Sequence, residues 1–248
     1  KKHSPTSTFQ SAREPCTSDS CPRGNMPDSI LTPLQHRVLT SLFQNGLTEQ
    51  SFYLTGGTAL AEYYLHHRQS DDLDFFTRKQ DRLDQDFTYL LNLIPSLGLE
   101  VASKTMSGDY LKLFVWEADR SREQLKIEFA RDVPAQMAPA TLLNGLVIDS
   151  FEDIATNKIC AILSRQPSEP KDFYDLYFIL HESNFTLDYL ISRAREKEAL
   201  LDTEDGILLL TANLLTVNNL PLMRELEPRI IKPVKAEELQ TFLSPLAT

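Results

Sequence analysis

The pattern of apolar and polar positions divides this chain into a mixed first part and a helical second part. Before residue 150, apolar side chains recur at helical spacing in three segments, 31–43, 58–65 and 87–94. Runs that favour strands lie between and after them, at 52–54, 72–76, 99–105, 110–117, 124–130 and 146–148. This alternation predicts an α/β (α+β) core built on a small mixed sheet.

After about residue 150 the strand signals stop and the apolar spacing becomes helical. Helices are expected at 151–164, 171–181, 187–200 and 206–217, with one or two shorter ones in 220–243. We therefore predict a core domain over residues 29–150 and a mostly helical C-terminal domain over residues 151–248. Residues 1–28 lack a periodic apolar pattern and are expected to be a disordered leader, with Met26 as a candidate native start.

Composition adds limits on the class of protein. Hydrophobic residues make up 42% and charged residues 24% of the chain, as in ordinary soluble globular proteins. The net charge of −10 argues against a surface that binds nucleic acids indiscriminately, while a local basic groove or a basic protein partner stays open. The three cysteines, Cys16, Cys21 and Cys160, have no framework spacing, which favours a reducing, cytoplasmic setting. No apolar run is long enough to span a bilayer, so no membrane association is expected.

The stretch 52–76 carries the first candidate chemistry. Gly56 and Gly57 follow a short strand and precede a helix, so their backbone N–H groups can approach a phosphate. Thr58 either joins this phosphate cradle or simply caps the helix. Asp72 and Asp74 share one face of the next strand, because side chains alternate along a strand. Two carboxylates aimed at one point favour a bound cation, and Mg²⁺ is the natural candidate.

A third acid is expected from a later strand. Glu128 faces the polar side of an otherwise apolar run, which makes it the best candidate for a further metal ligand. Lys126 lies on the same face, so a simple ion pair between Lys126 and Glu128 is the alternative interpretation. The adjacent His66 and His67 are expected at an exposed helix end rather than at a metal.

A second cluster lies in the helical part. Lys158 and Arg165 are seven residues apart and Asp172 and Asp175 three apart, so each pair shares a helix face. Either these side chains serve a site, or they form a buried ion-pair network that joins two helices. We favour a site for Lys158 and Asp172, and the ion-pair network for Arg165 and Asp175.

The order of these motifs resembles that of a known enzyme family. The first motif, within residues 52–76, is similar to that of the polymerase-beta-type nucleotidyltransferase superfamily. Its amino-acid sequence more closely resembles the AbiEii-like nucleotidyltransferase toxins of AbiE-type toxin–antitoxin systems. The residues that carry this resemblance are Gly56, Gly57, Thr58, Arg68, Ser70, Asp72 and Asp74, followed by Lys158, Arg165 and the Lys171-Asp172-x-x-Asp175-Leu176 segment.

The resemblance implies an Mg²⁺-dependent transfer of NMP from an NTP to an acceptor, with release of pyrophosphate. The implied acceptor is RNA, for instance the 3′ end of tRNA, or a protein hydroxyl, and a cognate antitoxin protein is expected. Carried over residue by residue, the catalytic set is Asp72, Asp74, Lys158 and Asp172, and the metal ligands are Asp72 and Asp74, to which strand alternation, and not the resemblance, adds Glu128. The nucleotide-binding set is Gly56, Gly57, Thr58, Lys158 and Arg165, and the supporting set is Arg68, Ser70 and Asp175. Two alternatives stay open, a module that binds nucleotide without transferring it and an aminoglycoside-type enzyme that modifies small molecules.

Overall fold

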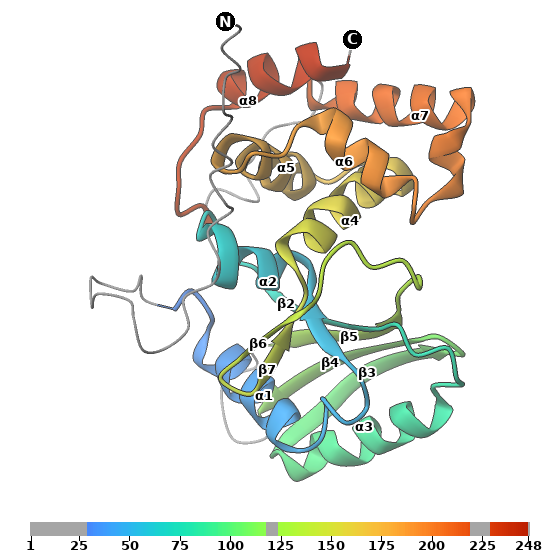
Figure 1. Ribbon diagram of the computed structural model, residues 1–248. Helices are drawn as coiled ribbons and strands as arrows, with labels where there is room; N and C mark the ends of the chain where they lie inside the picture. Colours follow the sequence, from blue (N-terminus) through green and yellow to red (C-terminus); the bar gives the residue numbers. More distant parts are fainter. Residues whose placement is uncertain (1–28, 118–123, 219–228, 248) are drawn as a thin grey trace, which may run out of the picture.

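A computed structural model describes residues 29–117, 124–218 and 229–247 of the chain (Figure 1). The predicted leader with Met26, the positions of Cys16 and Cys21, and the first part of the 220–243 segment, residues 220–228, lie outside the described residues.

A seven-stranded mixed sheet forms the lower half of the molecule, in the strand order β3-β4-β5-β2-β1-β7-β6 (Figure 1). Its strands are β1 (Tyr53–Thr55), β2 (Asp72–Thr77), β3 (Leu99–Ser107), β4 (Tyr110–Glu117), β5 (Leu125–Arg131), β6 (Thr141–Leu143) and β7 (Leu146–Ile148). The predicted mixed α/β core is confirmed. Strand β6 was not predicted, because three residues that pair only with β7 leave no readable alternation.

Strand alternation separates the two faces of this sheet. In β2 and β5 the apolar residues Leu73, Phe75, Ile127 and Phe129 are fully buried. They pack against helices α1 (Pro33–Gln44) and α3 (Asp84–Ser96), which cover that face (Figure 1). Burying each such side chain contributes roughly 1.5–3 kcal/mol to folding. The intervening polar residues of the two strands are thereby fixed on the opposite face.

A helix connects β1 to β2, and it changes from an α-helix to a π-helix along its length. Helix α2 (Gly56–Leu60) begins directly after β1 and continues as a π-helix, η1 (Ala61–Leu65), which ends at His66 in the left-handed conformation (φ +47°). The cap residue is Thr55, without a side-chain cap bond. The alternative interpretation, in which Thr58 caps this helix, is therefore wrong: its hydroxyl donates to the backbone carbonyl of Asp72 instead.

Helices make up the upper half of the molecule (Figure 1). They are α4 (Phe151–Ser164), α5 (Pro170–Glu182), α6 (Leu187–Ala194), η2 (Ala199–Asp202), α7 (Glu204–Leu215), η3 (Thr216–Asn218), α8 (Ala236–Leu243) and η5 (Ser244–Ala247). The single helix expected over 187–200 is wrong, because α6 ends at Ala194 and a separate 3₁₀ turn follows.

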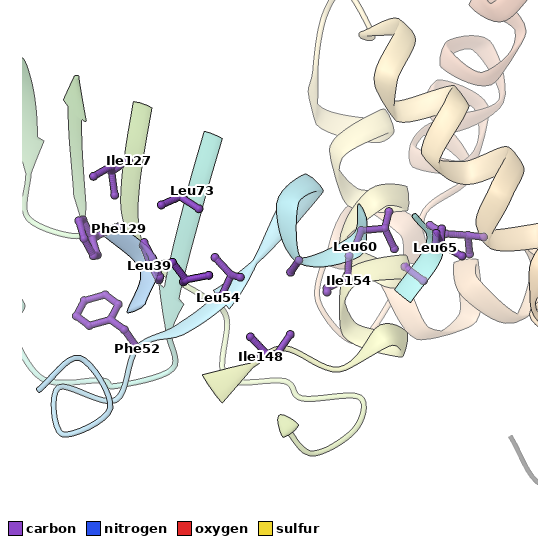
Figure 2. Packing of buried hydrophobic residues seen from close by; sticks show 14 of the residues in the cluster. Leu39, Phe52, Leu54, Leu60, Leu65, Leu73, Ile127, Phe129, Ile148 and Ile154 are labelled. Atoms are coloured by element: carbon purple, nitrogen blue, oxygen red, sulfur yellow. The ribbon is translucent and has the colours of Figure 1, made fainter. Parts of the chain in front are cut away.

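One hydrophobic cluster runs through both halves. Leu60 of α2 lies beside Ile154 of α4 between the sheet and the upper helices, as Figure 2 shows. The division into domains at residue 150 stays a prediction. Within the described ranges, no helix is long and apolar enough to cross a membrane.

Candidate active site

A cavity of about 410 Å³ lies where the polar face of the sheet meets α4 and the segment leading into α5. Most of the predicted site residues line it: Gly56, Gly57, Arg68, Ser70, Asp72, Asp74, Glu128, Lys158 and Arg165. Thr58, Asp172 and Asp175 do not line the cavity; they are buried behind its lining and bond to it. The fold therefore brings the glycine turn, the acids and the later basic cluster to one place.

The three predicted metal ligands are neighbours on the sheet. Strands β2 and β5 pair in parallel, and their register places Asp74 opposite Glu128. Asp72 lies two residues before Asp74 on the same face, and the hydroxyl of Thr58 holds its backbone carbonyl. Three carboxylates thus converge on the cavity from adjacent positions.

This crowding changes how the acids hold protons. Burial, with the charges of Glu128 and Asp72, raises the pKa of Asp74 to about 7. Burial would also raise the pKa of Glu128, but the hydroxyl of Tyr110 and the ammonium of Lys126 outweigh it, so this pKa is lowered. A proton shared by Asp74 and Glu128 therefore belongs to Asp74.

Lys126 lies opposite Asp72 in the sheet and connects two of the acids. Its Nζ is 2.8 Å from Oδ2 of Asp72 and 3.2 Å from Oε2 of Glu128. The ion pair considered as the alternative for Glu128 is thus present, and the role of Glu128 as a metal ligand stays a prediction.

The donor set fits Mg²⁺, since hard carboxylate oxygens facing an open cavity are the ligands this ion prefers. In the arrangement seen across the described residues, no three His, Cys, Asp or Glu side chains already stand at metal-holding distances. In this arrangement the ammonium of Lys126 bonds to both Asp72 and Glu128.

The glycine turn comes so close to these acids that side chains do not fit. Gly56 has φ +71°, and a Cβ there would lie 2.3 Å from Oδ2 of Asp74. A Cβ on Gly57 would lie 2.7 Å from Nη2 of Arg68 and 3.0 Å from Oγ of Ser70. The backbone of this turn is therefore exposed to the cavity, and no side chain caps the helix that starts there. Such a turn suits an anionic ligand.

The later cluster forms a buried network. Nζ of Lys158 lies 3.2 Å from Oδ1 of Asp172 and 2.7 Å from Oδ2 of Asp175. Arg165 donates to Oδ2 of Asp172 at 2.6 Å rather than to Asp175. Nε of Arg68 donates to Oδ1 of Asp175 at 2.6 Å. The two readings of the cluster coexist, because Lys158 and Arg165 both belong to the ion-pair network and line the cavity.

The electrostatics of this network keep Asp175 and Lys158 charged. Burial would raise the pKa of Asp175, but Arg68 and Lys158 hold it well below its usual range. Burial would lower the pKa of Lys158, but the charges of Asp175 and Asp172 outweigh that effect, so this pKa is raised.

The predicted surface position of His67 is wrong. Its side chain is fully buried, and Nε2 lies 2.7 Å from Oδ1 of Asp175. Burial lowers the pKa of His67.

Several lining residues were given no role by the sequence, among them Tyr110, Asn157, Glu169 and Lys171. The hydroxyl of Tyr110 donates to Oε1 of Glu128. Alternation along β4 places Tyr110 on the polar face of the sheet. Once the pairing of β4 with β5 is known, this alternation is enough to predict that Tyr110 lies near Glu128.

A second buried network lies outside the cavity lining and joins the sheet to the upper helices. Arg78, just after β2, bonds to Asp153 at 2.9 Å and Asp132 at 3.2 Å, while Nζ of Lys197 lies 2.8 Å from Asp153. Asp149 also contacts Arg78 at 3.5 Å, and burial with the charge of Asp153 raises the pKa of Asp149 to about 6. This network fixes the start of α4, the helix that carries Lys158.

Comparisons with known proteins bear on the family and the fold of the chain. The family model described as "Nucleotidyl transferase AbiEii toxin, Type IV TA system" matches residues 37–247. An uncharacterized protein of Aquifex aeolicus (strain VF5) is 33% identical over 170 residues, which cover 68% of this chain and 76% of that protein.

Two solved structures have a similar fold. JHP933 from Helicobacter pylori has a TM-score of 0.52 at 24% identity and covers 86% of this chain and 89% of its own. MenT4, a nucleotidyltransferase toxin from Mycobacterium tuberculosis H37Rv, has a TM-score of 0.53 at 21% identity. The match covers 87% of this chain and 80% of the MenT4 chain. At these identities the likeness shows the fold.

Proposed function

Since the chain belongs to the AbiEii family of nucleotidyl transferase toxins of type IV toxin–antitoxin systems, we propose that it transfers NMP from an NTP to RNA. Its enzyme class is nucleotidyltransferase. The observation that carries the proposal is the convergence of three parts on one cavity: the Gly56-Gly57 turn, the acids Asp72, Asp74 and Glu128, and the cations Lys158 and Arg165.

These parts match the needs of nucleotidyl transfer. The acceptor hydroxyl oxygen bonds to the α-phosphorus, the bond from that phosphorus to the bridging oxygen breaks, and pyrophosphate leaves with the electron pair. The proton of the hydroxyl passes to one of the carboxylates. The protein therefore has to hold a triphosphate, orient a hydroxyl and balance negative charge.

We assign the triphosphate to the glycine turn and the two cations. Gly56, Gly57 and Lys158 all line the cavity, and Asp172 and Asp175 hold Lys158 in place. Arg165 bonds to Asp172 on one side and leaves 41% of its side chain exposed, so it can contact a phosphate from the rim. In this assignment Asp172 orients the two cations rather than reacting itself.

Asp72, Asp74 and Glu128 would hold Mg²⁺ in this proposal. When bound, this ion would neutralise the triphosphate and polarise the reacting oxygens. The acids supply the ligands, and burial together with the charges of Glu128 and Asp72 raises the pKa of Asp74.

For the acceptor we propose RNA, with the 3′ end of tRNA as the leading candidate. At the rim, two cations, Arg165 and Lys171, stand against one acid, Glu169, which pairs with both, in a chain of net charge −10. So few cations suit the binding of one end of a nucleic acid better than the binding of a long stretch of its phosphate backbone. A cognate antitoxin protein and action in the cytoplasm complete the proposal.

The test is incubation of the purified protein with Mg²⁺, each α-labelled NTP in turn and total RNA, beside an Asp74→Asn variant. The exposed Asp202→Asn serves as the matched control. Label in a small RNA band with the parent and Asp202→Asn, and none with Asp74→Asn, is expected. Circular dichroism should show that Asp74→Asn remains folded, because the amide has the same shape.

Other outcomes contradict specific parts of the proposal. Label in protein instead of RNA would replace the acceptor by a hydroxyl side chain. Bound nucleotide without pyrophosphate release would indicate a binding module, and full activity of Asp74→Asn would remove Asp74 from the metal ligands.

A further inference from the structure

Lys126 occupies an unusual position for an active-site cation. It projects from β5 beside Glu128 and opposite Asp72, and its ammonium bonds to both carboxylates at 3.2 Å and 2.8 Å. Its side chain is 25% exposed to the cavity, so it is not locked in the core. Among the described residues, it is the cation whose ion pairs reach the predicted metal ligands.

The other buried lysine of the cavity is held differently. Lys158 is bonded to Asp172 and Asp175, neither of which lines the cavity, and only 9% of its side chain is exposed. Lys158 is thus held by two acids that lie behind the cavity lining, Asp172 and Asp175. Lys126 is bonded only to acids that a metal would also need.

Three carboxylates gathered at one place repel each other, and a single ammonium offsets only part of that repulsion. A lysine suits a temporary neutralising role, because its charge sits at the end of a flexible four-carbon chain.

We propose that Lys126 is an internal counter-ion, which holds Asp72 and Glu128 together before metal binds and leaves Asp72 when the metal enters. The inference rests on the proposed function, since it takes these acids as metal ligands. Lys126 stabilises the metal-free protein and at the same time competes with the ion. It is a positioning residue that sets the metal concentration at which the site becomes filled.

The test compares Lys126→Met with the parent protein by titration with Mn²⁺ alone, followed by electron paramagnetic resonance of the free ion, and by competition with Mg²⁺. The matched control is Lys112→Met. Lys112 lies opposite Glu128 on the neighbouring strand β4 but does not line the cavity. Thermal unfolding with and without Mn²⁺ is measured on the same proteins.

Removing a unit charge beside a divalent ion should tighten Mn²⁺ binding by about tenfold or more. Without metal, Lys126→Met should also have a lower melting temperature than the parent. Added Mn²⁺ should raise the melting temperature of Lys126→Met by more than that of the parent. Lys112→Met should differ little from the parent in both measurements. Asp72→Asn should lose most of the binding in either background.

Equal or weaker Mn²⁺ binding by Lys126→Met, with binding by the parent intact, would overturn the counter-ion role and leave the proposed function standing. Absence of Mn²⁺ binding in the parent and in both lysine variants would instead overturn the metal site, and the counter-ion role with it.

Discussion

Arg68 and Asp175 form a two-point ion pair in the interior of the protein. Nε of Arg68 donates to Oδ1 at 2.6 Å and Nη2 donates to Oδ2 at 2.8 Å. The same guanidinium lies against Gly57, where a Cβ would come within 2.7 Å of Nη2. One arginine therefore connects the glycine turn, on the sheet side of the cavity, to helix α5.

Breaking this pair should destabilise the protein strongly. In Asp175→Asn, Arg68 and Lys158 lose the charge between them while remaining buried, so we expect a loss of about 3–5 kcal/mol in the free energy of unfolding. Denaturant unfolding followed by circular dichroism measures it. The exposed Asp202→Asn should change it by less than about 0.5 kcal/mol. A loss as small as that of the control would show that the buried pair contributes little.

The same carboxylate predicts a pH dependence of stability. The folded pKa of Asp175 is held well below the ordinary value of 3.8, so its contribution is fully present above about pH 4. Below that, the unfolded chain takes up a proton that the folded chain refuses, and stability falls by up to about 1.4 kcal/mol per pH unit. Unfolding curves from pH 6 to pH 3 should show this fall in the parent and a shallower one in Asp175→Asn. Parallel curves would contradict it.

The two glycines Gly56 and Gly98 offer a matched test of the turn. Both have positive φ, +71° and +74°, so alanine strains the backbone similarly at each by about 1 kcal/mol. A Cβ meets Asp74 at Gly56 and nothing within 4 Å at Gly98. Gly56→Ala should lower kcat/KM for nucleotide transfer about 100-fold or more, because it displaces Asp74, a proposed metal ligand. Gly98→Ala should keep near-parent activity, and similar losses in both variants would point to strain alone.

Tyr110→Phe should slow the reaction without unfolding the protein. The change removes the hydroxyl that donates to Glu128, a hydrogen bond to a charged group worth about 1.5–3 kcal/mol. We expect kcat for pyrophosphate release to fall about tenfold with little change in KM for the NTP. Tyr89→Phe is the control, since that hydroxyl bonds to the carbonyl of Asn45 away from the cavity. Unchanged kcat in Tyr110→Phe would remove Tyr110 from the site.

The parts of the fold that follow local rules could be predicted from the sequence. Alternation with the buried Leu73 and Phe75 placed Asp72 and Asp74 on one face of β2, and the structure confirms it. The same rule placed Glu128 on the polar face of β5. The placement depends only on which side chains are apolar, so one sequence is enough.

The parts that depend on how distant segments meet could not be predicted. The register of Asp74 against Glu128 follows from a parallel pairing that no local pattern specifies. His67 was expected at the surface, but the left-handed turn at His66 directs the chain inward beneath α5. The bonding of Arg165 to Asp172 rather than Asp175 likewise depends on how α4 meets α5.

The parallel pairing of β2 with β5 also bears on when the protein can become active during its synthesis. Asp72 and Asp74 emerge from the ribosome early, but Glu128 arrives only after β3 and β4, and the supports of Lys158 arrive later still, on α5. A nascent chain that stops before α5 has the acids without a fixed Lys158. Translation has to pass Asp175 before the site is assembled, so interrupted synthesis of this toxin-family chain yields fragments with an incomplete site.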